Sequence, residues 1–272
     1  MFGVYVTGSA ILMLLFEGLF GIMRQPNSWW LVPLIFAGLC FVFFLIHILT
    51  VLIMILTTNL NKPPKGTKLF RFLIKTGLPY VLKLAGVKIE AQGLEKMPEN
   101  TRVLVVCNHQ HNFDPVIIVN SFPDAELSFI GKKEILTTMP FAARAMHLLE
   151  CLYIDRENDR EAAKTIIAAI KRIKNNEGSI ALFPEGYVSK TCELQPLRNG
   201  SLKIALKSQV PVVVCVINGT RVMAKSLFRR RSTVQFRLLD VINPEDYAEM
   251  NTAQLGDIIH EKMQMALKEI RG

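Results

Sequence analysis

Residues 103–115 read VLVVCNHQHNFDP, and they show what kind of fold to expect. The first five residues are apolar and mostly β-branched, which is typical of a strand buried on both faces of a parallel sheet. The run ends abruptly in polar residues, with His109 and Asp114 five positions apart. In such sheets, ligand sites lie beyond the carboxyl ends of the strands. The stretch therefore predicts a buried strand with a polar site at its end.

Other short runs resemble this strand. They are rich in Val, Ile, Leu and Phe and end at Gly, Pro, Asn or charged residues. These runs span residues 127–131, 152–154, 179–183, 210–217 and 233–240. Helical patterns lie between and after them, most clearly at 159–175 and 251–271. Strands alternating with helices predict an α/β fold with a mostly parallel sheet flanked by helices.

The first sixty residues differ in composition from the rest. Residues 4–23 are mostly apolar, and residues 29–57 contain no Asp, Glu, Lys or Arg. Because about 20 apolar residues suffice to cross a bilayer, we expect a transmembrane hairpin that turns at residues 24–28. Trp29 and Trp30 would then lie at the membrane interface. A signal peptide is the alternative for the first segment, but that segment lacks a basic start and a small-residue cleavage site.

Basic residues follow the second apolar segment, at Lys62, Lys65, Lys68, Arg71 and Lys75. Positive charge at this end predicts that the rest of the chain lies in the cytosol, on the inner face of the cell membrane. Residues 66–85 alternate basic and apolar residues, which predicts interfacial helices on anionic lipids, interrupted at Pro79. An ordinary packing helix is the alternative. The expected division is a transmembrane hairpin (1–58), a linker with interfacial helices (59–86) and an α/β domain (87–272).

The charge and the cysteine content limit the binding partners and the kinds of site to expect. The net charge of +9 favours binding to anionic partners. Anionic membrane lipids fit a chain with apolar segments, whereas no motif of nucleic-acid binding occurs. The five cysteines are an odd number without a CxxC pair, at Cys40, Cys107, Cys151, Cys192 and Cys215. This pattern predicts reduced thiols rather than disulfides or a zinc site.

The polar end of the 103–107 run predicts acid–base chemistry. A carboxylate fixes the tautomer of a histidine and stabilises the imidazolium, and a turn can bring Asp114 back to His109. The segment has no serine or cysteine nucleophile, so His109 would take a proton from a substrate hydroxyl. A purely structural pair is the first alternative. A metal site with His111 is the second, but the residues that follow do not fit a metallo-hydrolase string, and we expect neither metal nor cofactor.

Several blocks together resemble one family. Residues 108–114 resemble the NHxxxxD block of the glycerolipid acyltransferases, above all the 1-acylglycerol-3-phosphate acyltransferases. Further blocks follow in the family's order and are similar to KKEL…P (131–136 with Pro140), (F/Y)IDR (153–156), the start of FPEGTR (183–186) and IPV(V)PV (210–213). The resemblance covers about residues 85–220.

The resemblance implies transfer of a fatty acyl group from acyl-CoA or acyl-carrier protein to the free hydroxyl of 1-acylglycerol 3-phosphate, which forms phosphatidate in phospholipid biosynthesis. His109 would be the base and Asp114 its partner. The residues implied to bind substrate are Asn108, Lys132, Lys133, Arg156, Glu185 and Gly186. Arginine suits phosphate through its planar pair of donors, and a lysine would stabilise the oxyanion. The alternatives without a function are that the two lysines are solvated, that Arg156 lies on the surface and that Pro184-Glu185-Gly186 forms an ordinary turn.

The sequence departs from the family at Tyr187 and Val188, where Thr-Arg is usual. One expected phosphate cation is therefore missing, and Lys190, Arg198 or Lys203 could replace it. This leaves another lysolipid or glycerol 3-phosphate open as acceptor. A non-catalytic lipid-binding module is a further alternative, which the intact His–Asp pair disfavours. A hydrolase would need a nucleophile that the sequence does not provide.

Overall fold

The structure is a computed structural model that describes residues 2–21 and 30–271. The predicted turn at 24–28 and Trp29 lie outside the described residues. Trp30 is exposed at the start of the helix that follows. The five cysteines are unpaired, and three of them are buried.

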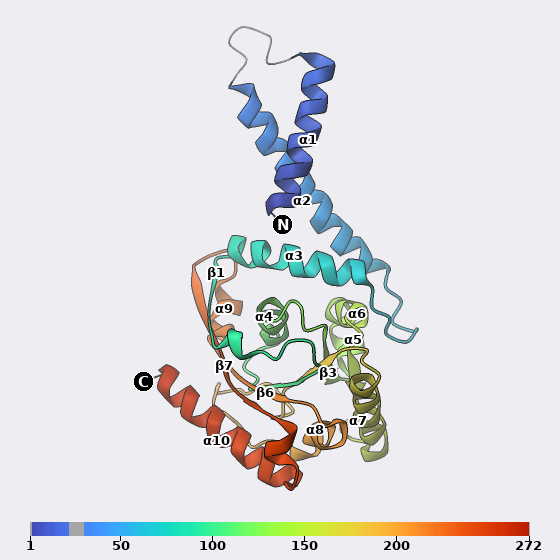
Figure 1. The fold of residues 1–272 in the computed structure, drawn as a ribbon, viewed down its shortest axis with the longest axis vertical. Coiled ribbons are helices and arrows are strands. Elements are labelled where there is room, and N and C mark those ends of the chain that lie inside the picture. The colour runs from blue at the N-terminus through green and yellow to red at the C-terminus, as the bar shows by residue number, and fades with distance from the viewer. Residues whose placement is uncertain (1, 22–29, 272) are drawn as a thin grey trace.

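A seven-stranded sheet forms the centre of the molecule (Figure 1). Its strands are β1 (Val87–Gln92), β2 (Leu104–Cys107), β3 (Leu127–Lys132), β4 (Leu152–Ile154), β5 (Ser179–Leu182), β6 (Val212–Asn218) and β7 (Ser232–Ile242), in the order β1-β7-β6-β2-β5-β3-β4. All neighbours pair in parallel except β6 and β7. The predicted α/β fold with a mostly parallel sheet is confirmed. Since β2 and β5 are neighbours, the polar segments that follow them meet at one edge of the sheet.

Helices cover both faces of this sheet. They are α4 (Asp114–Ser121), α5 (Ile135–Thr138), α6 (Pro140–Leu148), α7 (Asp159–Lys174), α8 (Lys203–Ser208), α9 (Thr220–Ser226) and α10 (Thr252–Arg271), with 3-10 turns η2 (Leu94–Lys96), η3 (Asn199–Leu202) and η4 (Pro244–Tyr247). Alternate residues of β2 enter two separate cores: Val105 packs with residues of α4, and Leu104 with residues of α7, α8 and α10. Burial on both faces explains why β2 is an unbroken apolar run.

The predicted helix at 159–175 forms as α7. It begins at Asn158, whose side chain accepts hydrogen bonds from the backbone N–H groups of Arg160 and Glu161, both at 3.1 Å. Its apolar side buries Ala169 and Ile173 against the sheet. The cap and the apolar face together explain the helix and its direction.

Two helices precede the sheet and project from one end of the domain (Figure 1). α1 (Phe2–Phe20) packs on α2 (Leu31–Thr57), and Cys40 Sγ lies 3.3 Å from Ser9 Oγ. By length and composition α2 can cross a membrane, as predicted, whereas α1 has only a shorter apolar stretch, Val6–Leu15. The second crossing of the predicted hairpin therefore stays a prediction.

The helix α3 (Lys68–Leu84) corrects one expectation, because it runs unbroken through Pro79. The Thr67 side chain caps its start by accepting a hydrogen bond from Phe70 N at 3.1 Å. Its inner face buries residues on both sides of Pro79, among them Leu73 and Leu82. An internal proline costs about 3 kcal/mol, and this packing on two sides outweighs it. Where α2 meets α3, His47 of α2 donates from Nε2 to Leu73 O at 2.9 Å.

Candidate active site

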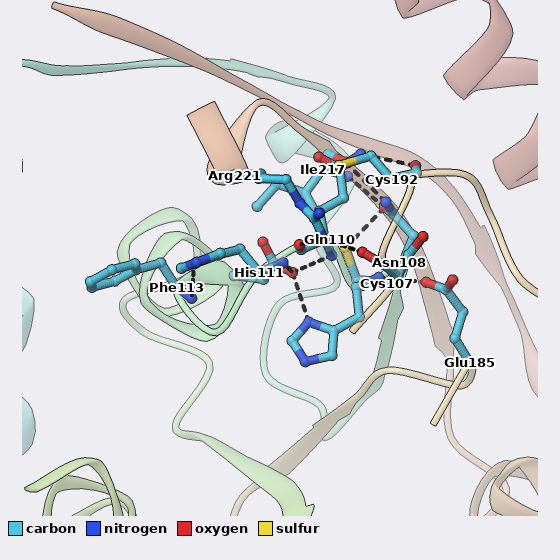
Figure 2. Close-up of polar contacts among 12 residues, drawn as sticks. Cys107, Asn108, Gln110, His111, Phe113, Glu185, Cys192, Ile217 and Arg221 are labelled. Atoms are coloured by element: carbon cyan, nitrogen blue, oxygen red, sulfur yellow. Dashed lines mark hydrogen bonds and ion pairs between the residues drawn. The ribbon is translucent and has the colours of Figure 1, made fainter. Parts of the chain in front are cut away.

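Asn108 follows β2 directly and ties it to β6. Its Oδ1 accepts a hydrogen bond from Ile217 N at 2.8 Å, and its Nδ2 donates to Ile217 O at 3.0 Å. The buried amide thus extends the pairing of the two strands beyond the end of β2. Figure 2 shows Asn108 next to Ile217, Gln110 and Glu185 at this edge of the sheet.

Asp114 begins α4 and holds the imidazole of His109. Its Oδ2 lies 2.7 Å from His109 Nδ1 and also accepts hydrogen bonds from Gln110 N (2.6 Å) and His111 N (2.8 Å). The carboxylate is fully buried, while the His109 side chain is 15% exposed. Because a carboxylate only accepts, the neutral imidazole carries its proton on Nδ1. His109 Nε2 makes no hydrogen bond to any described residue, so its lone pair is available to a substrate.

Glu185 joins the β2 loop to the loop after β5. Its Oε1 accepts a hydrogen bond from His109 N (2.5 Å) and its Oε2 from Gln195 N (2.8 Å). Burial raises the pKa of the Glu185 carboxyl to about 7; the two backbone N–H groups oppose this shift, and the nearby Asp114 carboxylate adds to it. Both oxygens are engaged by backbone, so Glu185 acts on the position of His109.

A groove of about 600 Å³ opens beside the Glu185 segment. Its apolar lining includes Ile166, Ile167 and Ile170 of α7. Phe183 also lines the groove, and its ring stacks on the His109 imidazole with centroids 4.0 Å apart and planes 13° apart. The groove therefore shares a wall with the candidate base.

The basic residues of the groove are Arg156, Arg198, Lys203 and Lys207. Burial and the charge of Arg198 lower the pKa of Arg156, while Glu134 opposes the shift. Neither arginine forms an ion pair with a described residue. Two nearby guanidinium groups without a carboxylate partner suit an anionic ligand such as phosphate.

Gly186 lets Arg198 lie close to the β5 loop. Its φ is +82°, and a Cβ placed on it would lie 2.8 Å from Arg198 Cδ. The backbone N–H of Arg198 donates to Pro184 O at 2.7 Å, which closes the loop. A glycine is needed here for both its conformation and its lack of a side chain.

The remaining predicted cations lie outside the groove lining. Lys132 and Lys133 are exposed at the end of β3, and Lys133 Nζ pairs with Asp155 at 3.4 Å. Lys190 does not line the groove, whereas Arg198 and Lys203 do. Of the three candidates for the missing cation, the structure thus brings Arg198 and Lys203 to the groove that holds Arg156.

Some residues that shape the site were not predicted. Arg221 of α9, which Figure 2 shows near Gln110, donates to the backbone oxygens of Gln110, Ser189 and Lys190 and so braces the two loops. The Gln110 side chain accepts a hydrogen bond from Gly219 N at 3.1 Å. No motif marks these contacts, because the partners lie about 30 to 110 positions apart.

His111, beside the candidate base, is directed elsewhere. Its ring stacks on Phe113 with centroids 5.4 Å apart, and its Nδ1 accepts a hydrogen bond from Phe113 N at 3.3 Å. Burial lowers the pKa of His111, so the neutral form is favoured, against the pull of Asp114. His111 is thus a neighbour of the pair rather than a member of it.

Known proteins resemble this chain in sequence. An acyltransferase family model matches residues 88–218. The 1-acyl-sn-glycerol-3-phosphate acyltransferase of Borreliella burgdorferi is 29% identical over 70% of this chain and 76% of its own length. The enzyme of the same name from Haemophilus influenzae is 26% identical over 69% of this chain and 77% of its own length. The one from Saccharomyces cerevisiae is also 26% identical, over 70% of this chain and 64% of its own length.

A solved structure shares the fold. The crystal structure of a 1-acyl-sn-glycerophosphate acyltransferase from Thermotoga maritima superposes with a TM-score of 0.60 at 19% identity, covering 100% of this chain and 98% of that one. At this identity the likeness shows the fold alone.

Proposed function

We propose that this chain, which an acyltransferase family model matches over residues 88–218, acylates 1-acylglycerol 3-phosphate. The fatty acyl group comes from acyl-CoA or acyl-carrier protein, and the product is phosphatidate. The observation that carries the proposal is the His109–Asp114 pair, with a free Nε2, next to a groove lined by apolar side chains and cations.

The chemical step is a direct transfer. His109 Nε2 takes the proton of the acceptor hydroxyl while the oxygen of that hydroxyl attacks the thioester carbonyl carbon. Asp114 stabilises the imidazolium that forms. The carbon–sulfur bond then breaks, and the leaving thiolate takes the proton back from Nε2. The imidazole ends the cycle neutral, so no covalent intermediate with the protein is needed.

Arg156 and Arg198 hold the acceptor phosphate in this proposal. Two guanidinium groups that form no ion pair with a described residue give bidentate donors for a dianion. Arg198 replaces the cation that Val188 does not supply, and Gly186 leaves room for it. The isoleucines of α7 provide apolar surface for an acyl chain.

The other predicted substrate residues divide into two groups. The amide of Asn108 and the carboxyl of Glu185 bond to backbone, so we assign them positioning roles around His109. Lys132 and Lys133 stay proposed substrate contacts. Lys132 of β3 lies opposite Ile154 of β4 in the sheet, and Ile154 lines the groove. Both lysines are exposed. A donor with several phosphates fits cations at that place.

The proposal includes a membrane location. α2 anchors the chain, and α3 lies on anionic headgroups at the cytosolic face of the inner membrane, where lipid acceptor and product both reside. Lys62 and Lys65 lie between α2 and α3, and Lys68 is the first residue of α3, in keeping with that orientation.

The test is mass spectrometry of products formed by the full chain in nanodiscs. The acceptors are lysophosphatidate, lysophosphatidylcholine, glycerol 3-phosphate and monoacylglycerol, each with acyl-CoA and with acyl-carrier protein, and His109→Ala is the control. We expect phosphatidate from lysophosphatidate and none from the control. Turnover of monoacylglycerol alone contradicts the phosphate site, and fatty acid release without an acceptor indicates a hydrolase.

A further inference from the structure

The turn between α9 and β7 exposes an aromatic ring beside a run of charge. Residues 226–231, here the α9–β7 turn, read SLFRRR. Phe228 is 75% exposed, and the three arginines that follow it are exposed as well. A single exposed aromatic ring is common on folded domains and does not by itself indicate a binding surface. The residues around Phe228 must therefore be considered with it.

Two further apolar side chains are exposed near Phe228. Leu84, the last residue of α3, and Val222 of α9 are each 66% exposed. The backbone joins the turn to the end of α3, since Phe228 N donates to Ala85 O at 3.1 Å and Ser232 N to Gly86 O at 2.9 Å. The turn and the end of α3 therefore form one surface.

The charge on this surface has one sign. Its exposed cations are Lys83, Lys225, Arg229, Arg230 and Arg231. None of them forms an ion pair with a residue that the structure describes. The sequence has no Asp or Glu between Glu193 and Asp240. An uncompensated surface of this kind complements a polyanion.

The position of the turn points to the bilayer. Figure 1 shows α3 lying across the domain on the side from which α1 and α2 project. α2 enters at the start of α3, and the turn lies at its other end. A 17-residue helix is about 25 Å long. Leu69 and Phe72, near its start, are also exposed, so exposed apolar side chains occur at both ends of α3.

We propose that the α9–β7 turn is a second membrane contact, in which Phe228 enters the interface and Arg229, Arg230 and Arg231 bind the phosphates of anionic lipids. Aromatic rings favour the interface, and basic residues nearby bind anionic headgroups. A domain that is attached to the bilayer through α2 can pivot about this helix. A contact at the far end of α3 fixes its tilt and therefore the approach of lipid to the groove. Exposed apolar side chains among the cations favour a bilayer over an acidic protein as the partner.

Fluorescence quenching tests this contact in the full chain. Trp29→Phe and Trp30→Phe remove both tryptophans, and Phe228→Trp then places a single probe on the turn. Met265→Trp is the matched control, because Met265 is 58% exposed on α10, at the opposite end of the domain from α3. Both proteins are placed in nanodiscs of equal phosphatidylcholine and phosphatidylglycerol with brominated acyl chains, and circular dichroism checks their folding.

We expect several-fold stronger quenching and bluer emission at position 228 than at position 265. Adding Arg229→Gln, Arg230→Gln and Arg231→Gln lowers the quenching in the anionic nanodiscs. Equal emission at the two positions overturns the proposal, as does quenching that ignores both the arginine changes and the removal of phosphatidylglycerol. A probe that responds to added acyl-carrier protein but not to brominated lipid overturns it in favour of a protein partner.

Discussion

The loops after β2 and β5 lie side by side and are built in different ways. The β2 loop and the first residue of α4 place His109 and Asp114 five positions apart, and backbone N–H groups of the loop fix the carboxylate. The groove beside the β5 loop gathers its cations from three places, with Arg156 after β4, Arg198 in the β5 loop and Lys203 in α8.

In the proposed mechanism, the β2 loop carries out the proton transfer and the groove beside the β5 loop binds the substrate. Proton transfer depends on sub-ångström placement of one ring, and a short local loop provides it. Phosphate binding depends on the sum of charges around a groove, so a cation can come from a different position in the chain without disturbing the base. In the proposed site, Arg198 in the groove takes the place of the cation that Val188 does not supply, as this freedom allows.

Asp114→Asn should have the largest effect and tests the local half of the contrast. The amide does not stabilise the imidazolium, and it can present an N–H to Nδ1, which moves the proton of His109 to Nε2. We expect kcat to fall on the order of 1,000-fold, with KM for the acceptor nearly unchanged. Steady-state kinetics in nanodiscs measures both. A loss confined to KM would show that Asp114 acts in binding instead.

Arg198→Gln tests the distributed half. Loss of one charge-assisted contact should raise KM for lysophosphatidate about 10- to 100-fold, while monoacylglycerol, which has no phosphate, is unaffected. Lys190→Gln is the control, because Lys190 does not line the groove, and its kinetics should match the parent protein. Equal effects of the two changes would mean that bulk surface charge, and not the groove, attracts the acceptor.

Glu185 connects the two loops, and its raised pKa predicts a pH effect on stability. The folded protein holds the Glu185 proton up to about pH 7, whereas the unfolded chain releases it near pH 4.3. The contribution of Glu185 is therefore complete below the unfolded pKa and is lost as pH rises through about 7, by roughly 1–3 kcal/mol. Thermal unfolding at pH 5 and pH 8 should show a larger decline in the parent than in Glu185→Gln. Parallel pH profiles would refute the raised pKa.

Asn108→Ala tests whether the Asn108 side chain stabilises the position of the β2 loop. It leaves Ile217 N and O buried without their partners, which should lower the free energy of unfolding by about 1–2 kcal/mol. Asn120→Ala is the comparison, because its Oδ1 has no hydrogen-bond partner among the described residues, and it should cost less. Denaturant unfolding in detergent measures the difference, and equal losses would remove the special role of Asn108.

The sequence predicted the parts of the fold that local pattern controls. The run at 152–154 became β4 without change, and the helix predicted at 159–175 became α7. β1 was not predicted as a strand, because only its first residue is buried and the pairing with β7 that stabilises it is distant in sequence. The break expected at Pro79 was wrong, since contacts of α3 with α2 and the domain are invisible to helix propensity.

The site divides in the same way. The placement of Asp114 against His109 followed from a spacing of five residues. The contact of Glu185 with His109 N spans 76 positions, and the brace from Arg221 to Gln110 spans 111, so neither could be read from spacing. The choice among Lys190, Arg198 and Lys203 required the groove itself. The division of the chain at residues 58 and 86 stays a prediction.

The central claim is that the imidazole of His109 takes the proton of the acceptor hydroxyl, and kcat of His109→Ala tests it most directly. Turnover and lysophosphatidate binding should be measured on the same nanodisc sample. We predict a fall in kcat on the order of 1,000-fold or more while the acceptor still binds. A kcat within tenfold of the parent protein, with binding intact, would contradict the account.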